Sequence, residues 1–316
     1  MNGKGNMDKT VVVIAGPTAS GKTDLAINLA LETDGEVISA DSMQIYRYMN
    51  IGTAKPSKEE MKGIPHHMID IVNPDESYSV ALYKKDAENC IRDILSRGKL
   101  PIVAGGTGLY INSLIYNIKF SETVTDEEFR KSMQRIAETE GPEVLHEMLR
   151  KVDPESAEKI HANNVKRVIR ALEVYKYTKK PISQHQKESR TEPPEYRYLV
   201  FILDMDREKL YDRINKRVDK MLENGLVDEV KRLLEMGYKP GSTALQGLGY
   251  KEIIRYLNNE LPFDEAIRIL KRDTRHYAKR QLTWFRAIKE AVWLEGGNDN
   301  LEKNTKKIQE YLETSN

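Results

Sequence analysis

The chain has 316 residues, 39% of them hydrophobic and 31% charged, and its formal net charge is +1. This composition is that of a soluble globular protein of roughly two domains, and its near-neutral charge means that any nucleic-acid binding must come from local basic faces. The single cysteine, Cys90, excludes an internal disulfide, and no Cys or His spacing indicates a structural zinc site. No apolar run reaches membrane-spanning length and no signal peptide opens the chain, so we expect a cytoplasmic protein without a membrane segment.

The first predicted elements enclose a phosphate-binding motif. Thr10–Ala15 is a continuous apolar, β-branched run typical of a buried strand, and residues 24–31 have apolar residues at helical spacing. The loop between them fits the pattern G-x-x-x-x-G-K-[ST] at every fixed position: Gly16, Pro17, Thr18, Ala19, Ser20, Gly21, Lys22 and Thr23. In such a loop backbone N–H groups face an anion, Lys22 neutralises a terminal phosphate and the Thr23 hydroxyl binds Mg²⁺. A nucleotide and a prenyl diphosphate fit this motif equally well.

Two more strands are expected at residues 36–40 and 100–104, separated by an irregular segment and a helix over residues 80–96. The first ends at Asp41, which is a candidate general base or Mg²⁺ ligand, with a turn cap as the structural alternative. The second runs into a glycine-rich loop around Thr107, and a helix follows near Leu109. Alternating strands and helices predict an α/β fold, with a P-loop NTPase-like parallel sheet flanked by helices. Residues 16–23, 41–44 and 105–107 should therefore converge at the carboxyl edge of the sheet.

From residue 119 to 195 the strand signal disappears. We interpret 119–195 as an all-helical insertion into a catalytic core formed by 1–118 and 196–316. Within the insertion, a buried helical stripe is expected from Val165, Val168, Ile169 and Leu172. The basic residues Lys166, Arg167 and Arg170 share the opposite side. A basic face on a helical lobe suggests contact with a phosphodiester backbone.

A strand at residues 198–203 restores the sheet and ends at Asp204, which is a second candidate for holding Mg²⁺ or for capping a helix. In the helix that starts at residue 207, the core stripe is assigned to Leu210, Ile214 and Met221. Arg217 lies at the margin of this stripe and is positioned to reach inward over a phosphate, whereas Arg213 is expected nearer to solvent. A helix over residues 263–292 contains no Gly or Pro, and its aromatic residues are assigned to the core. Its basic residues include Arg268, Lys271, Arg272, Arg275, Lys279 and Arg280.

These motifs together resemble the tRNA dimethylallyltransferase (isopentenyl-diphosphate:tRNA transferase) family over nearly the whole chain. Besides the phosphate loop, the resemblance rests on Asp41-Ser42-Met43-Gln44-Ile45-Tyr46; Ile51-Gly52-Thr53-Ala54-Lys55-Pro56; Pro65-His66-His67-Met68-Ile69-Asp70; Gly105-Gly106-Thr107-Gly108-Leu109-Tyr110; Arg167-Val168-Ile169-Arg170-Ala171-Leu172-Glu173; Leu245-Gln246-Gly247-Leu248-Gly249-Tyr250-Lys251-Glu252; and Arg280-Gln281-Leu282-Thr283-Trp284-Phe285-Arg286. The sequence departs from the family at Val165-Lys166-Arg167, where Gln-Arg is usual.

The resemblance implies transfer of a dimethylallyl group from dimethylallyl diphosphate to N6 of the adenine 3′ of the anticodon, with release of diphosphate. It implies that Asp41 takes the amine proton, that Thr107 lies near the adenine, and that Lys22, Mg²⁺ and Arg217 stabilise the leaving diphosphate. The extruded adenine would enter a channel between the core and the insertion. The implied partner is the tRNA anticodon stem-loop, bound by a monomer through Asp41, Ser42, Met43, Gln44, Thr107, Lys166, Arg167, Val168, Ile169, Arg170, Gln246, Gly247, Leu248, Gly249, Tyr250 and Lys251.

Two other functions remain open from the residues alone. A P-loop nucleotide or nucleoside kinase would explain the phosphate loop and the helix with Arg213 and Arg217, but it leaves the basic helical faces unexplained. A non-catalytic RNA-binding module that uses nucleotide as a switch would leave Asp41 and Thr107 without a role.

Overall fold

The computed structural model describes residues 9–120, 126–189 and 192–314. It divides into two compact units. The core unit comprises Met1–Ile115 and Glu195–Asn316, and the insertion unit comprises Tyr116–Pro194. The expected insertion, residues 119–195, differs from the second unit by a few residues at its ends. Each unit is described by itself.

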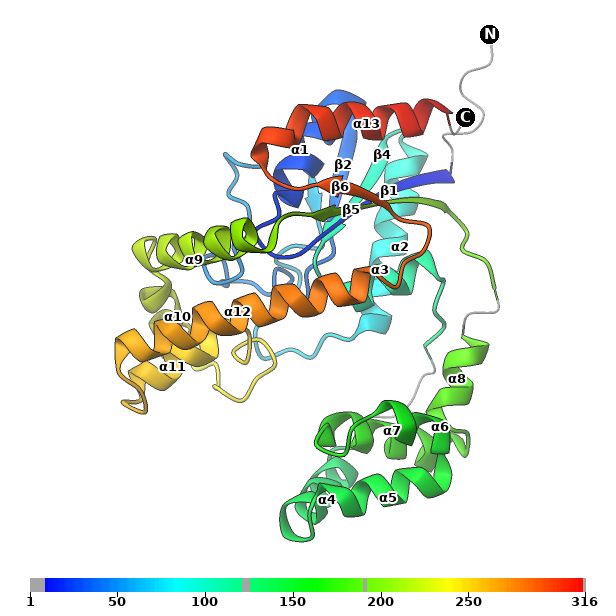
Figure 1. The fold of residues 1–316 in the computed structure, drawn as a ribbon, viewed down its shortest axis with the longest axis vertical. Coiled ribbons are helices and arrows are strands. Elements are labelled where there is room, and N and C mark those ends of the chain that lie inside the picture. Colours follow the sequence, from blue (N-terminus) through cyan, green and yellow to red (C-terminus); the bar gives the residue numbers. More distant parts are fainter. Residues whose placement is uncertain (1–8, 121–125, 190–191, 315–316) are drawn as a thin grey trace. The chain divides into compact units, whose positions relative to one another are not determined.

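The core unit is built on one parallel sheet, whose strand order is β3-β2-β4-β1-β5-β6 (Figure 1). The strands are β1 (Thr10–Ala15), β2 (Gly35–Ser39), β3 (His66–His67), β4 (Leu100–Gly105), β5 (Arg197–Asp204) and β6 (Val292–Glu295). The central strand β1 is buried along its whole length and pairs in parallel with β4 and β5, so that Ile14 stands beside Ala104 on one side and Phe201 on the other. Parallel pairing on both sides requires crossover helices, which the alternating sequence supplies. The predicted α/β fold class is confirmed.

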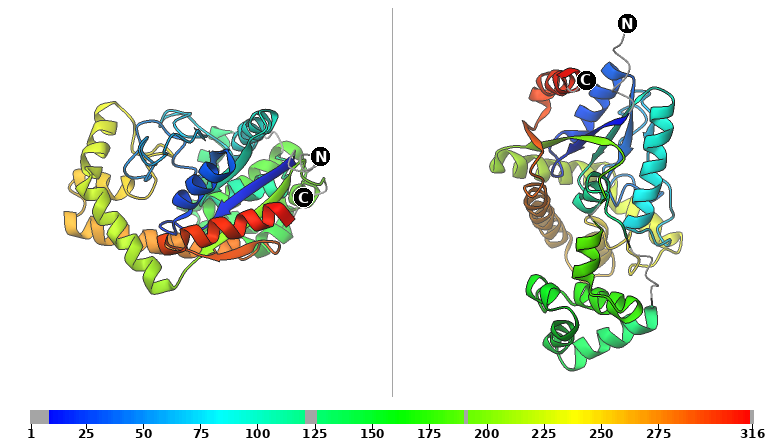
Figure 2. Two further views of the ribbon diagram at one scale, coloured as in Figure 1. Left: turned by 90° about the horizontal axis from the view of Figure 1, so that it is seen from above. Right: turned by 90° about the vertical axis from the view of Figure 1, so that its right-hand side faces the viewer.

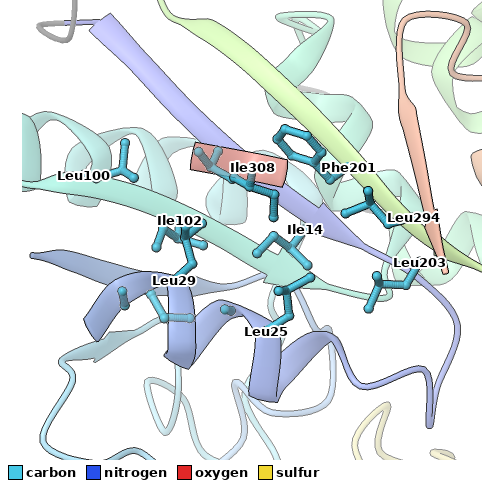
Figure 3. Close-up of a cluster of buried hydrophobic side chains, with 13 residues drawn as sticks. Ile14, Leu25, Leu29, Leu100, Ile102, Phe201, Leu203, Leu294 and Ile308 are labelled. Atoms are coloured by element: carbon cyan, nitrogen blue, oxygen red, sulfur yellow. The ribbon is translucent and has the colours of Figure 1, made fainter. Parts of the chain in front are cut away.

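Helices cover both faces of this sheet (Figure 2). The helices of the core unit are α1 (Lys22–Thr33), α2 (Val80–Ser96), α3 (Gly108–Ile115), α9 (Arg207–Glu223), α10 (Leu226–Glu235), α11 (Tyr250–Leu257), α12 (Phe263–Phe285) and α13 (Leu301–Thr314), with a 3₁₀ turn at Asn298–Asn300. Figure 3 shows the layer between the sheet and helices α1 and α13, in which Leu25 and Leu29 of α1 and Ile308 of α13 pack on Ile14 and Ile102 of the strands. This apolar layer fixes the start of α1, and with it the end of the phosphate loop.

A second apolar cluster lies beside the sheet. Helices α9, α10, α11 and α12 pack there on the segment that follows β2, through buried residues such as Tyr46, Val218, Leu226 and Tyr250. This cluster anchors the segment that leaves the carboxyl end of β2. It therefore builds a wall of side chains at the edge where ligands bind in parallel sheets.

The insertion unit is a small helical bundle with its own core. Its helices are α4 (Glu127–Thr139), α5 (Pro142–Val152), α6 (Pro154–Lys159), α7 (Val165–Thr178) and α8 (Ile182–Glu188). The expected stripe of α7 is confirmed, because Val168, Ile169 and Leu172 are buried with Leu145 and Leu149 of α5. Buried charges are paired here as they must be in a small core, since Glu173 of α7 accepts hydrogen bonds from the guanidinium groups of α4 and α7.

One sequence-based expectation about local structure was wrong, and one segment contains a strand that the sequence did not indicate. The helix expected over residues 263–292 ends at Phe285, and the chain then forms strand β6, in which Leu294 is buried and its neighbours Trp293 and Glu295 are exposed. The irregular segment after β2 contains the short edge strand β3, which pairs with Val37 and Ile38. Among the helices of the described ranges, none combines the length and the apolar character that a membrane crossing requires.

Candidate active site

A cavity of about 360 Å³ opens at the carboxyl ends of β1, β2 and β4 in the core unit. Its walls come from the phosphate loop and α1, from the residues after β2, from the segment that leads into α11, and from the inner faces of α9 and α12. The polar groups that line it include Thr18, Lys22, Thr23, Asp41, Ser42, Gln44, Arg217, Lys251, Tyr277, Arg280 and Gln281. The expected meeting of the phosphate loop with residues 41–44 is therefore confirmed.

The phosphate loop has the backbone shape that its glycines allow. Gly21 caps the N-terminus of α1 with φ of +94°, in the left-handed region where a glycine is favoured. Gly16 approaches β5 so closely that a Cβ atom there would lie 3.1 Å from the Leu203 carbonyl oxygen. The loop presents Thr18, Lys22 and Thr23 to the cavity, where the N-terminus of α1 favours a bound anion.

Two cations from different helices line the cavity, Lys22 of α1 and Arg217 of α9. Burial and the nearby charge of Arg217 lower the pKa of Lys22 to about 8, although the Asp41 carboxylate acts in the other direction. Burial also lowers the pKa of Arg217, and again Asp41 opposes the shift. The buried Arg217 Nε makes no hydrogen bond within the described ranges of the chain. Two poorly solvated cations, one with an unused N–H group, form a receptor for a polyanion.

Asp41 stands at the end of β2 between these cations and the loop after β4. Its Oδ1 accepts a hydrogen bond from the Met43 backbone N–H at 2.9 Å, which holds the carboxylate in a turn. The turn cap that was considered as an alternative therefore exists, and it orients the same carboxylate toward the cavity that it lines. Thr107 lies just behind this wall, because its Oγ1 accepts from the Ser42 N–H at 2.9 Å and its own N–H donates to Ala40 O at 3.0 Å.

Helix α9 departs from the expected arrangement in two ways. Its fully buried stripe consists of Leu210, Ile214 and Val218, whereas Met221 is only partly buried against the second apolar cluster. Arg213, which was expected nearer to solvent, donates through Nε to the Ala19 carbonyl of the phosphate loop at 2.8 Å. The periodicity misplaced this side chain because the long arginine stem extends from the helix margin back over the loop.

Asp204 does not line the cavity. Its Oδ1 accepts the N–H of the next residue, Met205, and its carbonyl oxygen accepts from Gly296 N. The cap of α9 is Asp206, which accepts from the N–H groups of residues 208 and 209. Asp204 is thus a structural residue of the β5 end rather than part of the cavity.

The segment before α11 supplies a further wall. Residues 246–251 all line the cavity, and Gly249 begins α11 with φ of +94°. Tyr250 is buried, and its hydroxyl donates to Glu229 Oε1 at 2.7 Å. The same carboxylate accepts the backbone N–H groups of residues 50, 51 and 52, so Glu229 ties two walls of the cavity together.

In the insertion unit, the expected basic face of α7 divides into exposed and engaged residues. Lys166 and Arg167 are exposed, while Arg170 is ion-paired with the buried Glu173. Val168 and Ile169 are also expected RNA-binding residues, and their side chains are buried in the core of the bundle. The basic side chains, not the apolar ones, are what α7 offers to a polyanion.

Three cavity supports escaped the sequence analysis: Glu229, Tyr277 and Gln281. Gln281 accepts from Thr18 N and donates to Gly106 O, although its motif had received no role. Glu229 could have been noticed, because a carboxylate falls on the apolar side of α10 between Leu226 and Val230. Nothing in the local pattern singles out Tyr277, which was assigned to the core.

The side chains of the described residues do not form a metal site by themselves. Within the described ranges, no three His, Cys, Asp or Glu side chains are grouped as a protein metal site requires. The oxygen donors at the phosphate loop are instead the Thr23 hydroxyl and the Asp41 carboxylate, both of which line the cavity. Such a site suits a hard cation that takes most of its ligands from a bound phosphate and from water.

Comparisons with known proteins agree with this geometry. The model of the IPP transferase family matches residues 44–288, and that of the isopentenyl transferase family matches residues 9–74. A relative from Acetivibrio thermocellus named tRNA dimethylallyltransferase is 62% identical over 305 residues, which are 96% of this chain and 97% of the relative. The crystal structure of tRNA delta(2)-isopentenylpyrophosphate transferase from Staphylococcus epidermidis is 45% identical, with a TM-score of 0.72 over 98% of this chain and 100% of that one. A eukaryotic dimethylallyltransferase acting on tRNA is 34% identical, with a TM-score of 0.77 over 96% of this chain and 78% of the other.

Proposed function

Since this chain belongs to the IPP transferase family, we propose that its cavity transfers a dimethylallyl group from dimethylallyl diphosphate to N6 of the adenine 3′ of the anticodon in tRNA. The chain is a tRNA-modifying prenyltransferase, in line with the names of its relatives. The observation that supports the detailed reaction is the arrangement of Lys22 and Arg217 around one cavity with Asp41. A polyanion and a group that must lose a proton can be held there together.

The reaction forms one bond and breaks another. The adenine N6 attacks the allylic C1, the bond between C1 and the diphosphate oxygen breaks, and the N6 proton passes to the Asp41 carboxylate. The amine needs such a base because its lone pair is delocalised into the adenine ring. Asp41 is oriented for this role by the Met43 N–H. Negative charge grows on the departing diphosphate, where Lys22, Arg217 and the loop amides stabilise it.

We also propose Mg²⁺ as the cofactor, held by the Thr23 hydroxyl and by diphosphate oxygens, where it would supply further charge neutralisation for the leaving group.

The tRNA anticodon stem-loop would contact the segment at residues 246–251 and the basic side chains of α7. The monomeric state and the cytoplasmic location that were expected from the sequence stay predictions.

A single assay tests this function. The protein is incubated with Mg²⁺, labelled dimethylallyl diphosphate and unmodified tRNA, and we expect label in the tRNA. Unlabelled tRNA, together with phosphate transfer from ATP to a small acceptor, would instead establish the kinase alternative.

Two matched substitutions test the role of Asp41. Asp41→Asn should retain tRNA binding and lose transfer by a factor of about 10²–10⁴, the range that general-base catalysis contributes. Asp204→Asn makes the same change at the end of β5, outside the cavity, and should leave transfer unchanged. Transfer by Asp41→Asn within a few fold of the wild type would remove Asp41 as the base.

A further inference from the structure

Gln281 bridges two loops that approach the cavity from different strands. Its side chain is 6% exposed and projects from α12 between the phosphate loop and the loop after β4. The amide Oε1 accepts the Thr18 N–H at 2.9 Å, and the amide Nε2 donates to the Gly106 carbonyl at 2.8 Å. One planar amide therefore sets the spacing between a backbone donor of one loop and a backbone acceptor of the other.

The loop after β4 fits closely around this amide. A Cβ atom on Gly106 would lie 2.2 Å from Gln281 Nε2, so a side chain at this position would displace the bridge. One helical turn further along α12, the Trp284 ring covers Gly108, where a Cβ atom would lie 2.3 Å from the indole Cδ1. Both glycines that flank Thr107 are thus seated directly against α12.

Thr107 connects the loop after β4 to the residues around Asp41. Its N–H donates to Ala40 O, and its Oγ1 accepts the N–H of Ser42, the residue that follows Asp41. A displacement of the loop after β4 would therefore move Thr107 and the turn that holds Asp41. The opposite end of the same amide holds Thr18, which lines the cavity beside Lys22.

We propose that Gln281 is a positioning residue that fixes the distance between the diphosphate-binding loop and the Thr107–Asp41 side, where the adenine reacts. The inference rests on the proposed function. Misplacement of reactants by about 1 Å can cost on the order of 10²-fold in rate without removing either binding site. Gln281 also lines the cavity, but both polar atoms of its amide are engaged by backbone groups of these two loops, through which its effect on transfer acts.

The first test replaces the amide by an apolar side chain of similar length. Gln281→Met should lower the single-turnover transfer rate by roughly 10- to 100-fold at saturating substrates, while the dissociation constant for pyrophosphate and the KM for tRNA change less than about threefold. Gln309→Met, in α13 of the same unit, is the matched control and should transfer at the wild-type rate. An equal loss of pyrophosphate affinity and of transfer would overturn the inference, because Gln281 would then only build the phosphate loop.

A second variant tests the donor and acceptor roles themselves. Gln281→Glu keeps the shape but places a carboxylate oxygen against the Gly106 carbonyl, whereas its protonated form again offers one acceptor and one O–H donor. Its transfer rate, divided by that of Gln281→Met at each pH, should therefore rise as the pH falls from 8 to 5.5. The charged and titratable groups that share the cavity with residue 281 are Lys22, Asp41, Arg217, Lys251, Tyr277 and Arg280. They are the same in both variants, so the part of the pH dependence that they contribute independently of residue 281 cancels in this ratio.

The outcomes separate this inference from the proposed function. A wild-type protein that transfers no label contradicts the proposed function. A wild type that transfers, with both variants within threefold of it, contradicts the role of Gln281 alone. A pH-independent ratio between the two variants also overturns it, because repulsion at Gly106 would then play no part.

Discussion

Replacing Lys22 by methionine should make the ligand-free protein more stable at neutral pH. Burial and the charge of Arg217 lower the pKa of Lys22 from its ordinary value of 10.5 to about 8. At roughly 1.4 kcal/mol per pH unit, keeping the ammonium group charged in the folded protein costs about 3 kcal/mol at pH 7. Methionine has a similar length and no charge, so Lys22→Met should raise the free energy of unfolding by up to about this amount.

The dependence on pH has a definite sign. Between pH 8 and 10.5 the unfolded chain holds the Lys22 proton while the folded protein releases it, so this residue makes wild-type stability rise with pH. At about pH 9.5 the remaining cost is about 1 kcal/mol. The stability difference between Lys22→Met and the wild type should therefore shrink by about 2 kcal/mol between pH 7 and pH 9.5.

Urea denaturation of both proteins at the two pH values measures this difference. Ionisations elsewhere are common to the two proteins and cancel, and Lys216→Met, at a side chain that is 75% exposed on α9, should show a pH-independent difference of less than about 0.5 kcal/mol. Pyrophosphate titration should show that Lys22→Met loses binding. A variant that is less stable than the wild type at pH 7, with the same difference at pH 9.5, would refute the assignment of a buried, costly cation to Lys22.

Three other substitutions test the supports of the cavity and the RNA-binding face. Glu229→Gln should lower the free energy of unfolding by about 2–4 kcal/mol, because one amide cannot accept all four hydrogen bonds that the carboxylate accepts from three backbone N–H groups and the tyrosine hydroxyl. Urea denaturation measures this loss, with Glu235→Gln at an exposed position as the control variant. Arg213→Leu should weaken pyrophosphate binding about tenfold by releasing the Ala19 carbonyl, and unchanged calorimetric affinity would show that the loop needs no such support. Lys166→Ala should lower the slope of log tRNA affinity against log salt by about one, and an unchanged slope would exclude Lys166 from the phosphate contacts.

The parts of the fold that could be predicted are those whose signals are local. The apolar run of β1, the glycine pattern after it and the spacing of α7 lie within single segments of the chain, and each was read correctly. Strand β6 was missed because its four residues follow α12 with no Gly or Pro between them. Its partner is β5, about 90 residues earlier in the chain, where Ile202 pairs with Trp293. Such pairing depends on the burial of Leu294 in the assembled core, which no local pattern records.

The residues of the candidate site likewise fall into those that a local sequence pattern reveals and those that it does not. Lys22 and Asp41 could be found because each follows a recognisable strand, and the carboxyl ends of parallel strands meet. The roles of Arg213 and Gln281 could not, because their partners lie 194 and 263 residues away in the sequence. Both side chains bind backbone groups, which are present at every position and leave no pattern in the sequence of the partner. Side chains that position a loop are therefore harder to predict than those that meet its ligand.

The loss of stability that the buried cations cause and their affinity for a polyanion both follow from the low solvation of the cavity. Burial of Lys22, together with its repulsion by Arg217, lowers the pKa of Lys22 and destabilises the empty protein. Low solvation also strengthens the attraction of each cation for a diphosphate, since charges interact more strongly where water is excluded. In the proposed function, a bound diphosphate would neutralise both cations at once, so it would relieve their repulsion while gaining the attraction. Pyrophosphate should consequently stabilise the wild-type protein against urea more than it stabilises Lys22→Met, by an amount that grows with its concentration as mass action requires.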